Sequence, residues 1–145
     1  AAITRSLLIA IISILIFSII IEMHIYNIMY IFIFAFLGSF ILGALGFIAG
    51  LWAEKFDHTA TVTNFVITPL SFLSGVFYSI DRLPSFFLVI SNFNPFFYVI
   101  DGFRYGFLGV SDGSIIFGII YLTILSFITG FIAFYLYKKG YKIKS

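Results

Sequence analysis

Cysteine is absent from the 145-residue sequence, and charged side chains are scarce. The missing cysteine excludes disulfides, thiolate metal sites and cysteine nucleophiles. Charged residues make up 10% of the chain and the net charge is +2, against about 25% charged residues in ordinary soluble domains. A net charge this small gives no reason to expect a nucleic-acid partner. The phosphate-binding patterns GxxxxGKS and GxxxxGKT are also absent, so we expect this chain to bind no ATP and no other cofactor itself.

Apolar and aromatic residues are abundant instead, at 62% and 21% of the chain, and the mean hydropathy is +1.18. Four long apolar runs cover residues 3–21, 28–53, 59–79 and 115–137. A helix needs about 20 apolar residues to cross a bilayer, so each run predicts a span. The first run is too long for the core of a signal peptide and has no small-residue cleavage site behind it. We therefore expect an all-α membrane protein with four spans, whose N-terminal portion precedes Ala1.

Small residues recur at helical spacing along the second run, at Ser39, Gly43, Gly46 and Gly50. Residues 46–50 form a GxxxG pattern, which lets helix backbones approach closely in lipid. This face predicts tight helix packing. The partner helix is either a neighbouring span or a second copy of the chain.

The third run combines polar residues with a proline. Its polar and small residues fall at spacings of three and four and so predict one helical face: Thr61, Asn64, Thr68, Ser71 and Gly75. Pro69 removes one backbone donor from the middle of the span and leaves the carbonyl of Phe65 without its usual partner. A polar stripe inside a membrane faces protein or water, since hydrocarbon offers it no partner. It therefore indicates either hydrogen bonds between helices or the lining of a translocation path.

The stretch from residue 83 to residue 109 is apolar but interrupted, and Asn94-Pro95 divides it into pieces of 11 and 14 residues. If the second piece crossed the bilayer, Asp101 and Arg104 would lie near its middle, at a cost of roughly 2.5–3.5 kcal/mol each. Pieces of this length are typical of re-entrant or interfacial helices, and Pro95 suits the first position of a helix. We therefore expect two short re-entrant half-helices outside the last span.

The distribution of basic residues is compatible with the same topology but does not decide it. Four spans gather six basic residues on one side of the membrane, against Arg82 and Arg104 on the other: Arg5, Lys55, Lys138, Lys139, Lys142 and Lys144. The positive-inside rule places these six, and the C-terminus, in the cytoplasm, where the lysine tail also suits anionic membrane lipid. A five-span arrangement would place five basic residues on one side and two on the other, so this count does not separate the two topologies. The cost of placing Asp101 and Arg104 inside the membrane favours four spans.

Several short motifs together resemble the ABC-2 family of ABC transporter permeases, the membrane subunits of bacterial exporters for drugs, polysaccharides and lipid-linked glycans. They are the run 67–80, Leu83-Pro84, Asn94-Pro95, Tyr98 and residues 103–106 (Phe-Arg-Tyr-Gly). The resemblance implies six spans per subunit, of which this chain supplies the last four, in the bacterial inner membrane. It implies a second permease subunit, identical or different, and a separate ATP-binding subunit that holds ATP and magnesium.

The resemblance also suggests roles for the residues. The polar face of the third run together with Tyr78 would line the path, and the re-entrant segment with Pro84, Asn94, Pro95 and Tyr98 would gate or brace the exit. The Asp101–Arg104 pair would hold that segment in shape. The substrate stays open.

Two other functions remain as alternatives. One is a non-transporting membrane anchor or assembly subunit, against which the polar stripe and Pro69 argue mildly. The other is a membrane enzyme acting on lipids, which would need converging acids, bases or metal ligands. The six carboxylates form no pair at catalytic spacing within one span, and Glu54, Asp57 and His58 make a weak metal motif. We therefore expect no catalytic and no metal-binding residues.

Overall fold

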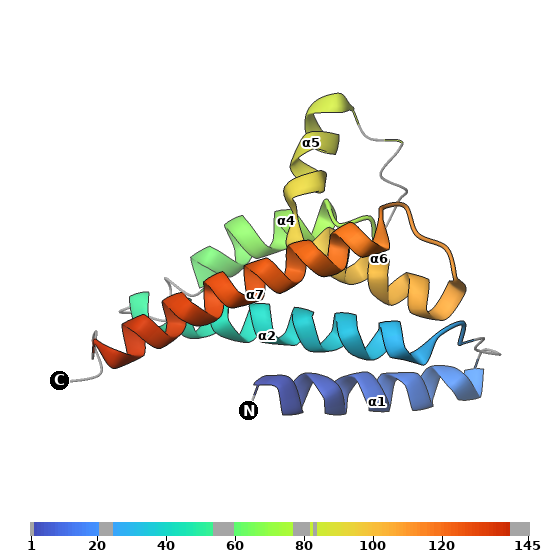
Figure 1. Cartoon of the computed structure of the whole chain (residues 1–145), viewed down its shortest axis with the longest axis horizontal. Coiled ribbons are helices and arrows are strands. Elements are labelled where there is room, and N and C mark those ends of the chain that lie inside the picture. The colour runs from blue at the N-terminus through green and yellow to red at the C-terminus, as the bar shows by residue number, and fades with distance from the viewer. Residues whose placement is uncertain (1, 21–24, 54–59, 77–81, 83, 140–145) are drawn as a thin grey trace.

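The computed structural model describes residues 2–20, 25–53, 60–76, 82 and 84–139, and throughout these ranges the regular structure is helical (Figure 1). The helices are α1 (Ala2–Ile20), α2 (Ile28–Trp52), the π-helical turn η1 (Thr63–Ile67), α4 (Thr68–Phe72), α5 (Ser85–Phe93), α6 (Pro95–Leu108) and α7 (Ile115–Lys138). The all-α prediction is confirmed for this part of the chain. The elements η1 and α4 belong to one apolar helix, Ala60–Phe72. We call it the Pro69 helix.

Two of the helices, α2 and α7, are long and apolar enough to cross a membrane. Apolar stretches in two further helices are shorter, Ile3–Ile16 within α1 and the Pro69 helix. Large apolar side chains point outward along the helices, for example Ile19 at 86% and Phe65 at 77% exposure, and such surface is typical of contact with lipid or another protein. The membrane class is therefore supported, while the expected number of four spans rests on two clear helices and two shorter ones.

Helix α2 is central: it packs most extensively against α6 and α7 and also contacts α1. The buried core lies where α2, α6 and α7 meet and consists of Phe34, Ile41, Phe97, Tyr98 and Leu122. Apolar residues cover all sides of α2 and α7, so the core is set by where the helices meet and not by a single apolar face on each helix. The core therefore joins α2 to the consecutive helices α6 and α7, which lie more than 40 residues further along the chain.

The contact between α2 and α6 is close because glycines stand on it. A Cβ atom at Gly38 would lie 2.7 Å from Cγ1 of Val99, and one at Gly102 would run into the ring of Phe34. One turn further along α6, a Cβ at Gly106 would run into Ile31. Glycine lets two backbones approach to a distance that any side chain would prevent, so α2 and α6 form one tightly packed unit.

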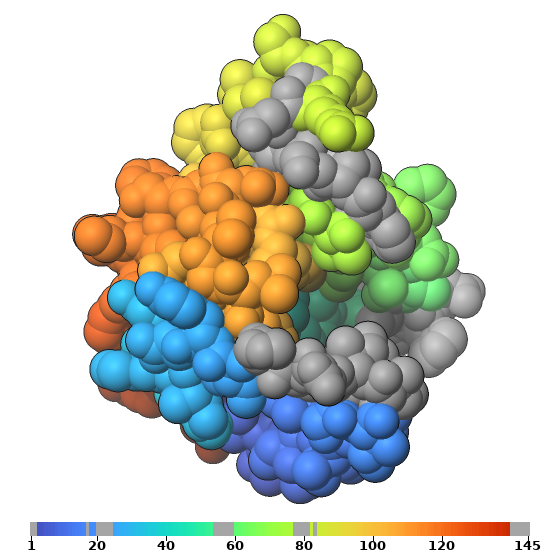
Figure 2. Space-filling model, turned by 90° about the vertical axis from the view of Figure 1, so that its right-hand side faces the viewer, coloured from blue at the N-terminus to red at the C-terminus, as the bar shows by residue number. Residues whose placement is uncertain are grey.

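Successive long helices run in alternating directions, so their ends gather at common ends of the molecule (Figure 1). The last turns of α1 and the Pro69 helix and the first turns of α2 and α7 lie at the same end of the molecule (Figure 1). At that end the backbone N–H of Asn27 donates to the carbonyl of Gly106, 2.9 Å away. Helix α5 lies across the others near the middle of the molecule's length (Figure 1), and Figure 2 shows it projecting from the rest of the molecule. The chain thus passes back and forth, with α2 and α7 parallel.

Candidate functional site at the junction of α5 and α6

The chain breaks between α5 and α6 where the sequence predicted it, at Asn94-Pro95, and the two helices are bent by 79°. Pro84 immediately precedes α5, and Pro95 is the first residue of α6. The Oδ1 atom of Asn94 accepts a hydrogen bond from the backbone N–H of Phe96 at 3.0 Å. Asparagine is a preferred N-cap, and proline at the next position has no donor to lose. These two residues together end one helix and begin the next.

Tyrosine hydroxyls complete the end of α5, where the last carbonyls of a helix have no partner within it. The hydroxyl of Tyr98 donates to the carbonyl of Asn92 at 2.8 Å, and that of Tyr121 donates to the carbonyl of Phe93 at 2.6 Å. Tyr98 lies on α6 and Tyr121 on α7. The end of α5 is therefore held by both neighbouring helices.

Two buried polar side chains connect this junction to the Pro69 helix. The Nδ2 atom of Asn94 donates to the carbonyl of Leu70 at 2.6 Å, and the hydroxyl of Ser91 donates to the carbonyl of Leu73 at 3.0 Å. Ser91 and Asn94 are 0% and 1% exposed. An unsatisfied buried polar group costs roughly 1–3 kcal/mol, so both side chains fit this position only while the end of the Pro69 helix stays in place. Asn94 thereby links three helices.

A charge cluster fixes the loop between α6 and α7. One nitrogen of Arg104, Nη2, lies 2.6 Å from Oδ1 of Asp101 and 2.8 Å from Oδ2 of Asp112. The buried carboxylate of Asp101 also accepts the backbone N–H groups of Asp112 at 2.8 Å and Gly113 at 2.9 Å. A carboxylate with these three donors is well satisfied. Asp101 and Arg104 are thus in contact, as their spacing suggested, and Asp112 joins them.

The polar stripe of the third run lies on the Pro69 helix, where Thr61, Asn64 and Thr68 are exposed, Ser71 is half-buried and Gly75 is buried. Gly75 has a φ of 80°, which favours glycine. The hydroxyls of Thr68 and Ser71 donate to carbonyls of their own helix, at 3.0 and 2.8 Å. Tyr78 lies outside the described residues. The path-lining role of these residues stays a prediction.

The structure differs from the expected spacing in one respect. Residues Thr63–Ile67 form a π-helical turn, in which the N–H of Thr68 bonds to the carbonyl of Thr63. Such a turn holds one extra residue, so positions before and after it do not share one α-helical face. The wide turn directly precedes Pro69, whose ring would clash with the carbonyl of Phe65 in a regular helix. The periodicity argument could not include this shift.

The small face of α2 is divided between two environments. Ser39 accepts a hydrogen bond from Ser6 of α1, with 2.6 Å between the two hydroxyl oxygens. Gly43 lines a cavity beside it, whereas a Cβ atom at Gly46 or Gly50 would meet nothing within 4 Å in the described structure. Packing at Gly46 and Gly50 therefore remains a prediction about a partner.

Sequence reasoning missed Ser91, Tyr121, Asp112 and the pair Gly102 and Gly106. The two glycines form a GxxxG pattern as plain as that at residues 46–50, so a signal was present. Ser91 precedes Asn94 by three residues and could have been grouped with it. Nothing local marked Tyr121 or Asp112. Among the described residues, no group of three His, Asp or Glu side chains gathers as metal ligands would.

Known proteins with similar sequences include membrane transport proteins. The model of the family described as "ABC-2 type transporter" matches residues 1–108. The chain is 45% identical over 84 residues to the inner membrane transport permease YadH of Escherichia coli (strain K12), an alignment that covers 57% of this chain and 33% of that permease. It is 36% identical over 66 residues to nodulation protein J of Rhizobium leguminosarum bv. viciae, which covers 46% of this chain and 26% of that protein. The matches thus span a third or less of these relatives. No solved structure matches.

Proposed function

Because this chain belongs to the ABC-2 type transporter family, as its motifs predicted, we propose that it forms the C-terminal part of the permease subunit of an ABC exporter. In this proposal the permease lies in a bacterial inner membrane, as the name of the YadH relative states for that protein. A separate subunit binds ATP with magnesium and hydrolyses it. A second permease subunit, identical or different, completes the path for the substrate.

The proposed topology has four spans, an external region from residue 80 to residue 113 and a cytoplasmic C-terminus. Its support is the direction of the helices: α2 and α7 run parallel and begin at the same end (Figure 1). A fifth crossing before α7 would make them antiparallel. Helix α6 has 14 residues, about 21 Å at 1.5 Å per residue, and this is shorter than the roughly 30 Å hydrocarbon layer.

The position of α6 along α2 supports a helix that enters the membrane and returns. Its first residues, Pro95 and Phe96, line a cavity with Leu45, deep along α2. Its last turn bonds to Asn27 at the beginning of α2. Helix α5 lies across the others and so adds little depth (Figure 1). We therefore assign α6 as the half-helix that dips in from the outer side.

The observation that carries the transport function is the connection of the Pro69 helix to the α5–α6 junction. This helix has a polar stripe, a π-helical turn and a proline, and residues 63 to 69 are all exposed. Its end is bonded to Ser91 and Asn94. When ATP binding moves the helix, these bonds carry the movement to the junction of α5 and α6. A pure anchor would have no need of such a linkage.

The test is ATP-driven export by the full-length permease, reconstituted in proteoliposomes with its ATP-binding subunit. We expect Asn94→Ala to lower export about tenfold, since it removes the bond to Leu70 and the cap of α6 together. The matched control is Asn92→Ala, because Asn92 is exposed and contributes its backbone carbonyl. Export that is equal in both variants, with assembly intact, would refute the coupling role.

A further inference from the structure

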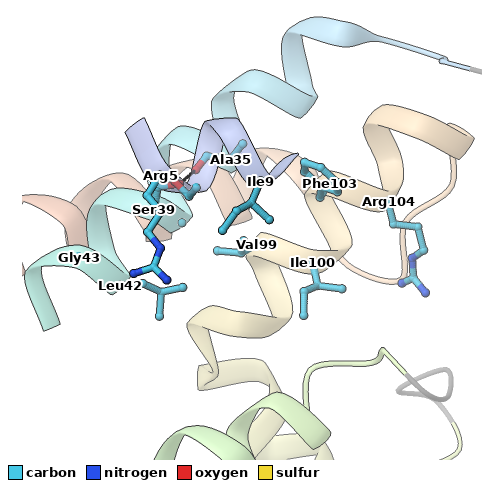
Figure 3. Close-up of a pocket in the computed structure, with 12 residues that line it drawn as sticks. Arg5, Ile9, Ala35, Ser39, Leu42, Gly43, Val99, Ile100, Phe103 and Arg104 are labelled. Carbon is cyan, nitrogen blue, oxygen red and sulfur yellow. Dashed lines mark hydrogen bonds between the residues drawn. The ribbon is translucent and has the colours of Figure 1, made fainter. Parts of the chain in front are cut away.

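A cavity of about 710 Å³ lies between α1, α2 and α6. Its walls are almost entirely apolar and include Ile9, Leu42 and Ile100 (Figure 3). Two arginines line it, Arg5 from α1 and Arg104 from α6, toward opposite sides in Figure 3. An apolar cavity with a few charged groups is the usual form of a ligand site.

The two arginines differ in their charge balance. Arg104 is within hydrogen-bond distance of both Asp101 and Asp112, so its charge is compensated. Neither of the ion pairs within the described ranges involves Arg5. Arg5 is exposed toward the cavity, with its guanidinium near Leu42 (Figure 3). The cavity therefore carries one positive charge that the described residues leave uncompensated.

Arg5 also lies deep along α2. The neighbouring Ser6 is bonded to Ser39, which lies near the middle of the 25-residue helix α2. At 1.5 Å per residue the helix is about 37 Å long, so Arg5 lies roughly 18 Å from either end. The sequence had placed Arg5 with the cytoplasmic charges. This register instead puts it at membrane depth, where a lone charge costs roughly 2.5–3.5 kcal/mol and by default marks a functional site.

We propose that this cavity binds an anionic amphiphile, whose acidic headgroup pairs with Arg5 while its apolar chain lies along Ile9, Leu42 and Ile100. The guanidinium offers several donors in one plane and suits a phosphate or carboxylate. The apolar walls suit a hydrocarbon chain. The site depends on the membrane position proposed for α2 and not on export.

The test is the lipid preference of the purified full-length permease subunit in nanodiscs of phosphatidylcholine with added phosphatidylglycerol of the same chains. Native mass spectrometry measures which lipid stays bound. We expect wild type to retain phosphatidylglycerol, and Arg5→Gln to weaken that preference about tenfold or more. Arg5→Lys keeps the charge and should retain much of the preference. The control is Arg82→Gln, because Arg82 does not line the cavity.

A second test, independent of the charge of Arg5, is to fill the cavity with a larger side chain. Ala35 lines it, and Ala49 lies on the same helix outside it, so Ala35→Leu should weaken retention of phosphatidylglycerol while Ala49→Leu should not. An unchanged preference in Arg5→Gln, or an equal loss in Arg82→Gln, would overturn the proposal.

Export assays on the same preparations separate this proposal from the function. If Arg5→Gln loses lipid selectivity and still exports, the ligand is a resident lipid, and if it loses both, the ligand belongs to the transport path. Either result supports the site. A wild-type permease that binds phosphatidylglycerol through Arg5 but shows no ATP-driven export would contradict the proposed function alone.

Discussion

Helix α6 and the Pro69 helix are attached to the rest of the molecule in contrasting ways. Where α6 meets α2, a glycine of one helix faces a side chain of the other. Gly38 of α2 faces Val99, and two glycines of α6 face Phe34 and Ile31. These contacts leave no room for one helix to shift against the other. The Pro69 helix makes few contacts with the other helices, and residues 63 to 69 are all exposed. Ser91 and Asn94 donate hydrogen bonds to carbonyls at its end.

This difference separates a rigid part of the molecule from a part that can move. Close apolar packing has little tolerance for displacement because interiors are already dense. Hydrogen bonds at one end of an otherwise exposed helix allow it to tilt about that end. We therefore regard α2, α6 and α7 as the frame, and the Pro69 helix as the element that moves against it. The predictions below test each side of this contrast.

The largest effect should come from Gly102→Leu, which forces a side chain into the ring of Phe34. Overpacking a dense core costs about 1–3 kcal/mol and occasionally more, and here no flexible neighbour can yield, so we expect about 3 kcal/mol or more. The measurement is the free energy of unfolding of the purified subunit. Gly46→Leu is the matched control, with open space around it. Equal destabilisation by both variants would remove the distinction between frame and surface.

A smaller effect should come from Asp101→Asn in the charge cluster. The carboxylate accepts two hydrogen bonds at Oδ1 and one at Oδ2. An amide has a single acceptor oxygen, so asparagine can keep at most the two at Oδ1, and its NH₂ group then faces the N–H of Gly113. We expect a loss of about 2 kcal/mol in unfolding free energy, and faster hydrogen exchange in the loop 109–114. Asp112→Asn should cost less, because that side chain is more exposed. A reversed order would place the anchor of the loop at Asp112.

Local sequence signals predicted much of the frame. The apolar runs, the break at Asn94-Pro95 and the i, i+3 pair of Asp101 and Arg104 follow from length, cap chemistry and helical spacing. The two GxxxG patterns could not be ranked, because the motif does not say which neighbour approaches it. Gly102 and Gly106 face α2 tightly, while Gly46 and Gly50 face open space.

Long-range contacts could not be predicted in the same way. The bonds from Ser91 and Asn94 go to backbone carbonyls, and every residue has a carbonyl, so no side-chain pattern identifies the acceptor. The π-helical turn before Pro69 is similarly a response of the backbone to a steric clash. The depth of Arg5 depended on the pairing of Ser6 with Ser39. These features join segments distant in sequence and appear only in three dimensions.

The most direct test of the movable helix is hydrogen exchange of the assembled transporter, followed by mass spectrometry. Amides of the Pro69 helix should exchange at least tenfold faster than those of α2 between Ile31 and Ile41, which lie in the packed core. Asn94→Ala should raise exchange further in residues 70–76 and leave α2 unchanged. Equal protection of the two helices, or loosening of both by Asn94→Ala, would contradict the division into frame and moving element.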